Sequence, residues 1–530
     1  MSVRIGNIRL PLDDDDGTAI DLALKTVGLP SSLRDQAYIV KRSPDLRRGQ
    51  AHFVYTIGLD LSEAQEENIV QKANISSVSR RDITPFRPVP GKDKLDGRPI
   101  IIGFGPAGMF AGLLLARFGY RPLIVERGQA LHERIQTISH FWENGILNAQ
   151  TNVQFGEGGA GTFSDGKLTT RIGDPLANWV LQEFVHHGAP TDILRLAKPH
   201  IGTDKLRHVV LSIREEIRSL GGEIRFETQL HDLKLQNGKI TDILLGTEHF
   251  QTGALILAVG HSARDTFSML QQAGVQLEPK AFSVGVRIEH LQENIDRALY
   301  GKYVGHPRLS KGEYQLSLRR GNEAVYTFCM CPGGTVVAAA SEQGGVVTNG
   351  MSNYLRNGKN ANAALVASIS AFSSPQEGIR FQKKLEHAAF LAGGSNFYAP
   401  CQTVGGFLNG NIKTFSQNIS PSYPIGVTPT RLDELFPANI TQRLRNGLLA
   451  FNKKIHGFSD EDAILTGVET RTSSPVRIPR SQNYEALAAE GLYPAGEGAG
   501  YAGGIVSAAV DGLRVASAIV ERYRPLEPGC

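Results

Sequence analysis

Three glycines with a fixed spacing give the sequence its clearest chemical signal. They are Gly103, Gly105 and Gly108, in the stretch GFGPAG that follows three isoleucines. The first permits a tight turn, the second lets backbone amides approach a pyrophosphate, and the third lets a helix pack closely on a strand. The N-terminal amides and positive dipole of that helix would then face the phosphates. The pattern predicts a dinucleotide site that includes Pro106 and Ala107.

An acidic residue supports this interpretation. Glu126 ends the next apolar segment, where a second parallel strand would finish. Its carboxylate is placed there to accept hydrogen bonds from ribose hydroxyls and to repel a 2′-phosphate, so we expect the site to exclude NADP. A glycine-rich packing turn that binds no ligand is the alternative.

Two further segments favour FAD over NAD as the bound dinucleotide. Arg127 and Arg134 follow in the pattern VERG...R, which occurs where the ADP part of FAD is held. Near the C-terminus, Gly496-Glu497 resembles the second FAD motif, in which the acid meets the ribityl chain or the pyrophosphate. We also predict cofactor contacts from Gly161, Thr162, Gly260, Gly504 and Ile505.

Candidates for the reaction centre each have a structural alternative. Lys167, in GEGGAGTFSDGKLTTR, could stabilise reduced anionic flavin, or it could be a solvated loop lysine. His290 could act as an acid or base because its unperturbed pKa is about 6.5, or it could be a structural histidine bound to backbone. Arg264 could clamp an anionic substrate or merely cap a helix.

Two more groups of residues could take part in the reaction. Arg471 and Arg477 lie in GVETRTSSPVRIPR, and either could bind a carboxylate bidentately or form salt bridges between domains. Cys329 and Cys331 form a C-x-C in which strand alternation would point both sulfurs the same way. We consider Cys331 as a nucleophile or a redox partner, against the alternative of two small core residues. Two thiols without a second pair do not make a zinc site, so we predict no metal.

The elements that would position these residues follow from hydrophobic periodicity. We predict strands at Pro99–Gly103, Pro122–Val125 and Gly253–Gly260, and a helix at Met109–Phe118. The last part of the chain returns to a strand, a turn and a helix after Leu492. A Rossmann-like domain would therefore be interrupted by an insertion and completed by the C-terminus.

The N-terminal part has a different pattern, which indicates most of a ferredoxin-like α/β module. Its expected strands are Ser2–Leu10, Gln36–Lys41 and His52–Leu61, and its expected helices are Gly17–Val27 and Ser62–Ala73. In the insertion we expect many short strands and two helices. The predicted organisation is a ferredoxin-like module at 1–75, a linker at 76–98, a Rossmann-like FAD-binding domain at 99–280 and 468–530, and a β-rich α+β substrate domain inserted at 281–467.

The chain resembles the FAD-dependent dehydrogenases of the two-dinucleotide-binding, glutathione-reductase-like flavoprotein superfamily. More narrowly, it resembles a group of uncharacterised bacterial and plastid FAD-dependent proteins. The resemblance covers nearly the whole chain and implies a flavin fold with an unassigned redox reaction. It is carried by FGEGGAGTFSDGKLTTR, LAVGHSARDTF, FSVGVRIEH, FCMCPGGTVVAAASEQGGVVTNGMS, GVETRTSSPVRIPR and PAGEGAGYAGGIVSAAVDG.

Composition excludes several classes of function. A net charge of +4 over 530 residues gives no basic stripe, so we expect no nucleic-acid partner. Glycines and a proline break the apolar run after Pro99, so it does not read as a membrane span. Four cysteines form no disulfide framework, and four aspartates precede any apolar signal region, so we expect a cytoplasmic protein. The oligomeric state is not fixed.

We expect an FAD-dependent oxidoreductase that transfers a hydride between an anionic small substrate and flavin N5. No second dinucleotide fingerprint occurs between residues 200 and 480, so either NADH or NADPH serves as a transient electron donor, or the electrons come from the substrate or a partner. One alternative is an FAD-dependent monooxygenase, although GEGAGYAGG departs from the Gly-Asp-Ala-Ala-His pattern of hydroxylases. Another is an FAD-binding protein whose N-terminal module grips a peptide or RNA.

Overall fold

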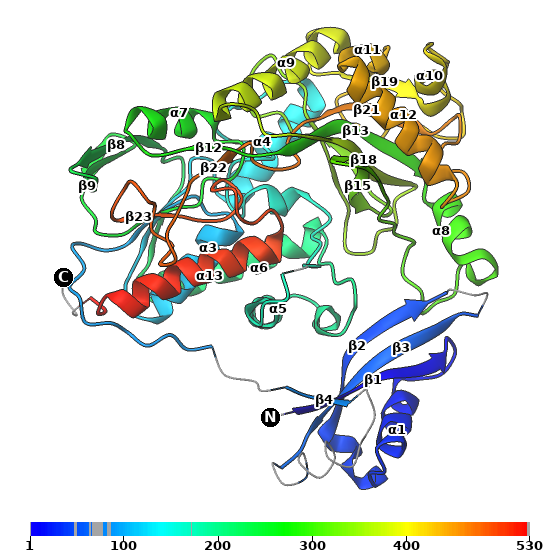
Figure 1. Cartoon of the computed structure of the whole chain (residues 1–530), viewed down its shortest axis with the longest axis horizontal. Helices are drawn as coiled ribbons and strands as arrows, with labels where there is room; N and C mark the ends of the chain where they lie inside the picture. Colours follow the sequence, from blue (N-terminus) through cyan, green and yellow to red (C-terminus); the bar gives the residue numbers. More distant parts are fainter. Residues whose placement is uncertain are drawn as a thin grey trace.

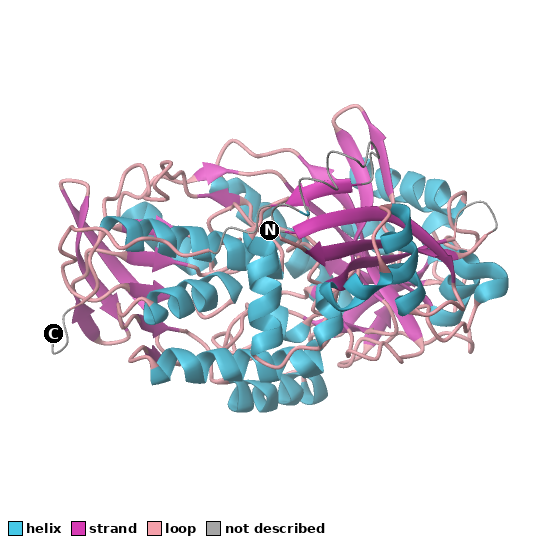
Figure 2. Cartoon of the chain, turned by 90° about the horizontal axis from the view of Figure 1, so that it is seen from below, coloured by secondary structure: helices cyan, strands magenta, loops and turns pink. Residues whose placement is uncertain are grey.

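The protein contains two large sheets and a small N-terminal module that lies beside them (Figure 1). The computed structural model describes residues 2–46, 50–62, 65, 78–81, 86–170 and 172–526. Within these ranges, no helix is both long and apolar enough to cross a membrane. Seen from below, the molecule is elongated (Figure 2).

A five-stranded parallel sheet forms the first large body, with the strand order β23-β11-β5-β6-β7. One face packs against α3, α6 and α13, and the other against the small sheet β10-β9-β8 and α7. Covering on both faces explains why its central strands are short and wholly apolar. The strands are β5 (Ile100–Ile102), β6 (Leu123–Val125), β7 (Glu223–Arg225), β8 (Leu230–Gln236), β9 (Lys239–Leu245), β10 (Glu248–Phe250), β11 (Leu255–Leu257) and β23 (Leu492–Pro494), and the helices are α3 (Pro106–Arg117), α4 (Leu131–Asn144), η3 (Ala160–Phe163), α5 (Leu176–His186), η4 (Thr191–Leu194), α6 (Thr203–Ser219), α7 (Arg264–Gln272) and α13 (Ile505–Arg522).

The C-terminal helix α13 completes this body by packing along α3. The two backbones approach so closely that a Cβ atom added at Gly512 would lie 2.1 Å from the carbonyl oxygen of Ala107. Within the first turn, a Cβ at Gly108 would lie 2.0 Å from the carbonyl oxygen of Gly103. Residues from both ends of the chain therefore share one core, and only glycine fits at these contacts.

The second large body is a seven-stranded sheet with the order β14-β15-β18-β13-β21-β19-β20, built from residues 282–469. The predicted boundary at 467 falls inside its strand β21. The many short strands expected here are present, although β13 and β18 each run for ten residues. The expectation of two helices was wrong, because the described chain forms five α-helices here. Two of those helices have six residues or fewer, too short for a periodic signal. The elements are β13 (Phe282–Leu291), α8 (Gln292–Tyr300), η5 (Gly301–Tyr303), β14 (Ser317–Arg320), β15 (Glu323–Cys331), β16 (Thr335–Ala338), β17 (Thr348–Met351), β18 (Asn360–Ile369), α9 (Pro375–Gly393), β19 (Ala399–Thr403), α10 (Val404–Asn409), β20 (Val427–Pro429), α11 (Leu432–Leu435), α12 (Ala438–Asn452) and β21 (Ile464–Glu469).

The chain passes between the two bodies through a pair of short antiparallel strands. These are β12 (Glu278–Pro279) and β22 (Val476–Arg477), which pair Glu278 with Arg477. The backbone N–H of Lys280 donates to the carbonyl of Pro475 at 2.9 Å and extends the pairing. The insertion therefore begins and ends at one place.

The N-terminal module has the sheet order β2-β3-β1-β4, with β1 lying antiparallel to both β3 and β4. Strand β4 falls at the start of the predicted linker, so the module extends further than expected. The predicted helix Ser62–Ala73 lies largely outside the described residues. The described elements are β1 (Ser2–Pro11), α1 (Asp16–Thr26), η1 (Ser31–Gln36), β2 (Ala37–Asp45), β3 (His52–Asp60) and β4 (Val78–Arg81).

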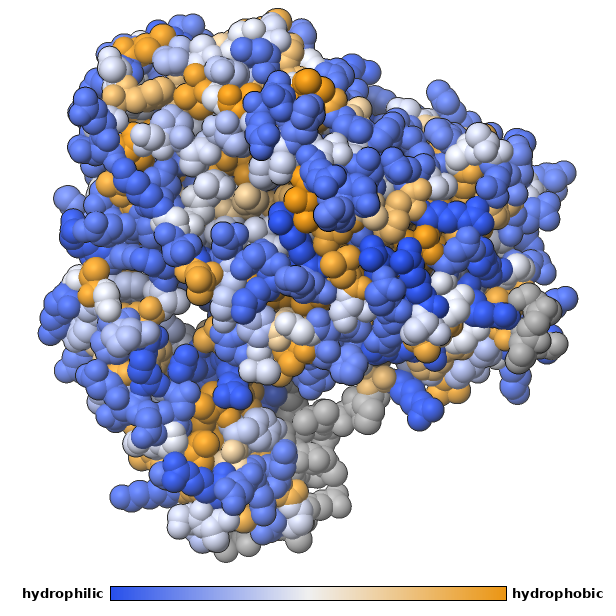
Figure 3. Space-filling view, turned by 180° about the vertical axis from the view of Figure 1, so that it is seen from behind, coloured by the Kyte–Doolittle hydropathy of each residue, from blue (hydrophilic) through white to orange (hydrophobic). Residues whose placement is uncertain are grey.

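The module touches both large bodies. The amide of Arg42 donates to the carbonyl of Arg195 at 2.7 Å, and the amide of Ala197 donates back to Arg42 at 3.1 Å. From the insertion, Arg308 donates to the carboxylate of Asp16 at 2.6 Å. Figure 3 shows a mostly hydrophilic face and a narrow opening where the module meets the rest of the molecule.

The packing of α3 on α13 can be tested by a substitution that would stabilise a free helix but should destabilise this one. In a free helix, Gly512→Ala would stabilise by about 1 kcal/mol because alanine has the higher helix propensity. Here the new methyl group meets a backbone carbonyl, so we expect a net loss of about 1–3 kcal/mol in urea unfolding. Ala518→Gly, at a half-buried position of the same helix, calibrates the propensity contribution. A stabilised Gly512→Ala variant would contradict the close approach.

Candidate cofactor and substrate site

Four loops meet at the carboxyl edge of the five-stranded sheet. Gly103, Glu126, Gly260 and Gly496 follow β5, β6, β11 and β23, which are neighbours in the order β23-β11-β5-β6. Ligands of open α/β sheets bind outside this edge. Segments widely separated in sequence therefore form one candidate site.

Close backbone contacts join the first and second motifs. A Cβ added at Gly496 would lie 2.9 Å from the Cβ of Ala107, at the start of α3. A Cβ at Gly161 would lie 3.3 Å from Ile505 and 4.0 Å from Pro106. The structure therefore brings predicted residues of both motifs together with the glycine-rich loop.

The N-terminus of α3 has the features of a diphosphate cradle. Gly105 is its N-cap and no side chain caps the first amides. A Cβ added at Gly105 would meet no heavy atom closer than the Cα of Gly159, at 3.7 Å, so the protein leaves space on this side. Free amides and open space at a helix N-terminus suit phosphate oxygens. The residues present thus fit the diphosphate of FAD.

Glu126 is buried and already holds three backbone amides. One carboxylate oxygen accepts from Phe104 at 2.9 Å, and the other accepts from Gly128 at 3.0 Å and from Gly156 at 2.9 Å. A carboxylate offers about four acceptor positions, so about one remains for a ribose hydroxyl. Glu126 therefore orders three loops of the site.

Two arginines predicted to meet the cofactor contact protein groups instead. Arg134 is fully buried and donates to the carbonyls of Asn152, Val153, Glu157 and Gly159. It therefore shapes the loop that lies against Gly105, a role that its position in the sequence did not reveal.

Arg127 forms a bidentate pair with Asp265 at 3.0 and 3.1 Å and donates to Thr266. This pair links the end of β6 to α7. Thr162 also faces the protein, because its hydroxyl donates to the carbonyl of Glu157 at 3.2 Å. The amide of Gly504 donates to Ser507 at the start of α13.

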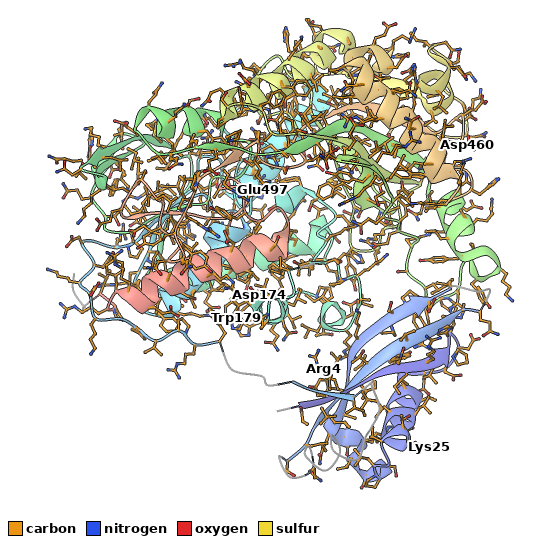
Figure 4. All side chains as sticks on the ribbon, viewed as in Figure 1. Arg4, Lys25, Asp174, Trp179, Asp460 and Glu497 are labelled. Atoms are coloured by element: carbon orange, nitrogen blue, oxygen red, sulfur yellow. The ribbon has the colours of Figure 1, made fainter. Side chains whose placement is uncertain are left out.

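Glu497 of the second motif and His261, which follows β11, are both held neutral. Burial raises the pKa of Glu497 to about 8, with Lys280 acting in the opposite direction, although about a quarter of the side chain is exposed. Burial, with Arg471 and Arg264, lowers the pKa of His261 to about 3. Their Oε2 and Nε2 atoms lie 3.9 Å apart. Figure 4 shows Glu497 near the centre of the molecule.

Two cations lie at the crossing between the bodies, where Lys280 acts on Glu497 and Arg477 acts on Lys280. Lys280 follows β12 and is half-buried, and its pKa is lowered by burial and by Arg477 while Glu497 raises it. Arg477 ends β22, is exposed, and lies 5.3 Å from the ring centre of Tyr501. These two side chains give the site a positive end.

The other predicted arginine is unavailable to a substrate. Arg471 and Arg264 both bind the buried carboxylate of Glu386, at 3.1 and 2.8 Å, and both also reach Glu342. Burial alone would raise the pKa of Glu386, but the two guanidinium groups outweigh it and hold the pKa below its ordinary value. Arg471 is thus a salt-bridge residue between the bodies, which corrects its prediction as a substrate ligand.

Three remaining candidates lie apart from the second motif. Lys167 is paired with Glu313 at 3.6 Å. His290 is buried against Phe458 and its Nε2 contacts the carbonyl of Phe458 at 2.8 Å, as its structural alternative requires. Cys331 is fully buried and its pKa is raised by a hydrogen bond with Cys329 and by burial, so Cys329 is the more readily ionised thiol of the pair.

Sequence reasoning missed Lys280, Asp511 and Glu386. Asp511 accepts from the amide of Gly496 at 2.7 Å and pairs with Arg480, so it fixes the second motif from α13. Its place inside the conspicuous stretch PAGEGAGYAGGIVSAAVDG was a usable signal. Glu386 lies in an unremarkable helix, and no local pattern marks it.

A cavity of about 670 Å³ lies elsewhere, against α4, and contains none of the predicted site residues. Among the described residues, no group of three or more His, Cys, Asp or Glu side chains could hold a metal ion. The carboxyl edge of the five-stranded sheet therefore remains the place where the motifs converge.

The chain is similar to known proteins over its insertion and over its whole length. Residues 281–472 match the family model described as "FAD-dependent protein, C-terminal domain-like". An "Uncharacterized protein" of Clostridium beijerinckii is 44% identical over 533 residues, which cover 99% of each chain.

Comparison with solved structures gives only distant similarity. A glycine oxidase from Geobacillus kaustophilus is 12% identical with a TM-score of 0.35, covering 82% of this chain and 96% of that one. A geranylgeranyl bacteriochlorophyll reductase-like protein from Thermoplasma acidophilum is 11% identical with a TM-score of 0.35, covering 81% and 79%. We infer nothing about this chain from scores this low.

The buried charges between the bodies predict acid sensitivity. Glu386→Ala leaves two buried guanidinium groups short of a partner, so we expect a loss of about 3–5 kcal/mol in urea unfolding. Lys383→Ala removes only an exposed partner of Glu342 and should cost less than about 1 kcal/mol. Because the folded pKa of Glu386 is depressed, its stabilisation is complete above about pH 4.3 and is lost as the pH falls further. In the Glu386→Gln variant, the free energy of unfolding should depend less on pH in this acid range. An unchanged dependence on pH would contradict the assignment.

The cradle at α3 can be tested by filling it. Gly105→Ala has room within the protein, so we expect unfolding without FAD to change little while FAD affinity falls tenfold or more, measured by flavin fluorescence. Gly108→Ala is the matched contrast, because its methyl group meets the backbone and should destabilise the protein itself. Unchanged FAD affinity in a folded Gly105→Ala variant would place the diphosphate elsewhere.

Proposed function

We propose that this chain, which belongs to the same family as the Clostridium beijerinckii protein and matches the FAD-dependent C-terminal domain model at 281–472, is an FAD-dependent oxidoreductase acting on an anionic small molecule. One observation carries the proposal: both FAD motifs converge at one sheet edge, and Lys280 and Arg477 lie beside the second motif. When bound, FAD would supply hydride chemistry at flavin N5.

The residues of the carboxyl edge would hold FAD. The α3 amides behind Gly105 would take the diphosphate, and Glu126 would take one ribose hydroxyl. Gly496 and Glu497 continue this surface toward the crossing strands, because Lys280 acts on the carboxyl group of Glu497 and Arg477 acts on Lys280. The reacting end of the site would therefore lie between the two bodies.

Lys280 and Arg477 would bind the charged group of the substrate. Arg477 can form two parallel hydrogen bonds to a carboxylate, and Lys280 adds a second positive charge. Burial lowers the pKa of Lys280, and an arriving anion would raise it again. The insertion supplies Lys280 at one end and the returning strand supplies Arg477 at the other.

Glu497 and His261 would donate and accept a proton beside the reacting centre. At neutral pH the carboxyl of Glu497 keeps its proton and the imidazole of His261 stays neutral. A neutral acid can donate a proton to a substrate anion, and a neutral imidazole can accept one. This arrangement suits a dehydrogenase or reductase of the glutathione-reductase-like superfamily, with NADH or NADPH as a transient donor.

The first experiment identifies the flavin and the substrate class. Purified protein is extracted and its flavin identified, and then anaerobic flavin reduction is followed with NADH, NADPH and a panel of small acids, each beside its neutral amide. We expect bound FAD and faster flavin reduction or reoxidation with acids than with amides. Protein that is colourless and takes up no added FAD would overturn the proposal. Rapid oxygen consumption with a hydroxylated product would instead establish a monooxygenase.

The cationic pair makes a charge-specific prediction. Lys280→Met and Arg477→Gln should each raise KM for the best acid about tenfold or more, because a charged hydrogen bond contributes about 1.5–3 kcal/mol. KM for the neutral amide and the FAD content should stay unchanged. Arg319→Gln, at an exposed position of β14, controls for loss of surface charge. An equal rise in KM for the acid and for the amide would show that Lys280 and Arg477 do not recognise the charge of the substrate.

A further inference from the structure

The C-x-C pair ends strand β15 in an irregular backbone. The pairing of β15 with β18 shifts between Phe328 and Cys331, which leaves a bulge at Cys329 and Met330. Cys329 has a φ of 43°, a conformation that non-glycine residues rarely adopt. Bulges and such residues often occur at functional sites. The pair is therefore more than a regular stretch of core strand.

The bulge brings the two thiols within reach of each other. Two residues of extended strand separate Cα atoms by about 6.6 Å, near the upper limit for a disulfide. The bulge at Cys329 and Met330 interrupts this extended geometry. The thiol of Cys331 also lies 3.4 Å from the carbonyl oxygen of Cys329. The geometry suits ring closure between the two sulfurs.

Charged groups around the pair favour a thiolate at Cys329. The guanidinium of Arg287 is fully buried and donates to the carbonyl of Cys329 at 2.8 Å, while it pairs with Glu469. Lys167 and Asp165 face the pair from the glycine-rich loop. The hydrogen bond from Cys331, with Arg287 and Lys167, lowers the pKa of Cys329 to about 6 against the effect of burial.

The two thiols differ in their access to solvent. Cys329 is half-buried, and the side chain of its neighbour Phe328 is 40% exposed. Cys331 is fully buried. A reagent can therefore reach Cys329 first, with Cys331 waiting behind it as a resolving thiol. Cys401 gives the contrast: it is buried away from this cluster, and burial raises its pKa.

We infer that Cys329 and Cys331 form a redox-active dithiol that exchanges with low-molecular-weight disulfides. The Cys329 thiolate attacks one sulfur of the disulfide, a mixed disulfide forms, and a thiolate leaves. Cys331 then attacks the sulfur of Cys329, closes the Cys329–Cys331 disulfide and releases the second thiol. The departing thiolate and the proton of Cys331 balance the step: one disulfide is reduced to two thiols, and the protein dithiol is oxidised. The exchange needs no flavin.

Alkylation tests the attacking thiol. In a Cys530→Ser background, the rate of iodoacetamide labelling at each cysteine is followed by mass spectrometry from pH 4.5 to 9.5. We expect Cys329 to label with a midpoint near pH 6, and Cys401 to stay unlabelled in folded protein. Lys167→Met should move the midpoint upward, whereas Lys198→Met should not, although both lysines pair with Glu313. A midpoint above pH 8 for Cys329 would overturn the assignment.

Glutathione buffers test the exchange itself. Equilibration at rising ratios of oxidised to reduced glutathione should remove two hydrogen masses from the protein. Cys331→Ser should instead retain one glutathione on Cys329, and Cys329→Ser should show neither product.

Circular dichroism and the unlabelled state of Cys401 report whether each variant is folded. If folded Cys331→Ser protein acquires no glutathione, or if wild-type protein never forms the internal disulfide, the pair is a structural element of the core.

Discussion

The close approach of backbones at a few glycines sets the positions of the strands, helices and loops that form the candidate site. Side chains at Gly103, Gly108 and Gly512 would collide with backbone carbonyls, so their absence sets the distance between β5, α3 and α13. Because α13 comes from the end of the chain, this contact also places the Gly496 loop beside the start of α3. The loops that would meet the diphosphate and the flavin are thus held by backbone geometry, and the polar side chains around them refine it.

Local patterns were enough to predict the first body, and long-range partners were not. The strands and helix around Gly103 appear as β5, α3 and β6, because their signals are short and self-contained. Arg134 and Arg471 were assigned to ligands because an arginine in a motif looks available in a sequence. Both are satisfied by groups that only the fold brings near: four carbonyls for Arg134, and Glu386 for Arg471. Lys280 went unnoticed because its neighbours in space lie near the other end of the insertion.

The buried ionisable groups are of two kinds, one that stays ionised and one that stays neutral. Glu386 stays ionised between two guanidinium groups and joins the bodies. Glu497 and His261 stay uncharged at neutral pH because burial outweighs their partners. The two groups are coupled, because Arg264 and Arg471, which bind Glu386, also lower the pKa of His261. The fixed charges of the two arginines therefore help to keep the imidazole of His261 neutral.

The paired crossing strands have a mechanical consequence. Since β12 and β22 lie side by side, the chain enters and leaves the insertion through a two-stranded ribbon. Packing also fixes the two bodies against each other, because Phe141 of α4 joins the core of the insertion and Arg264 of α7 binds Glu386 there. Lys280 follows one strand of the ribbon and Arg477 ends the other, so the backbone pairing sets their spacing.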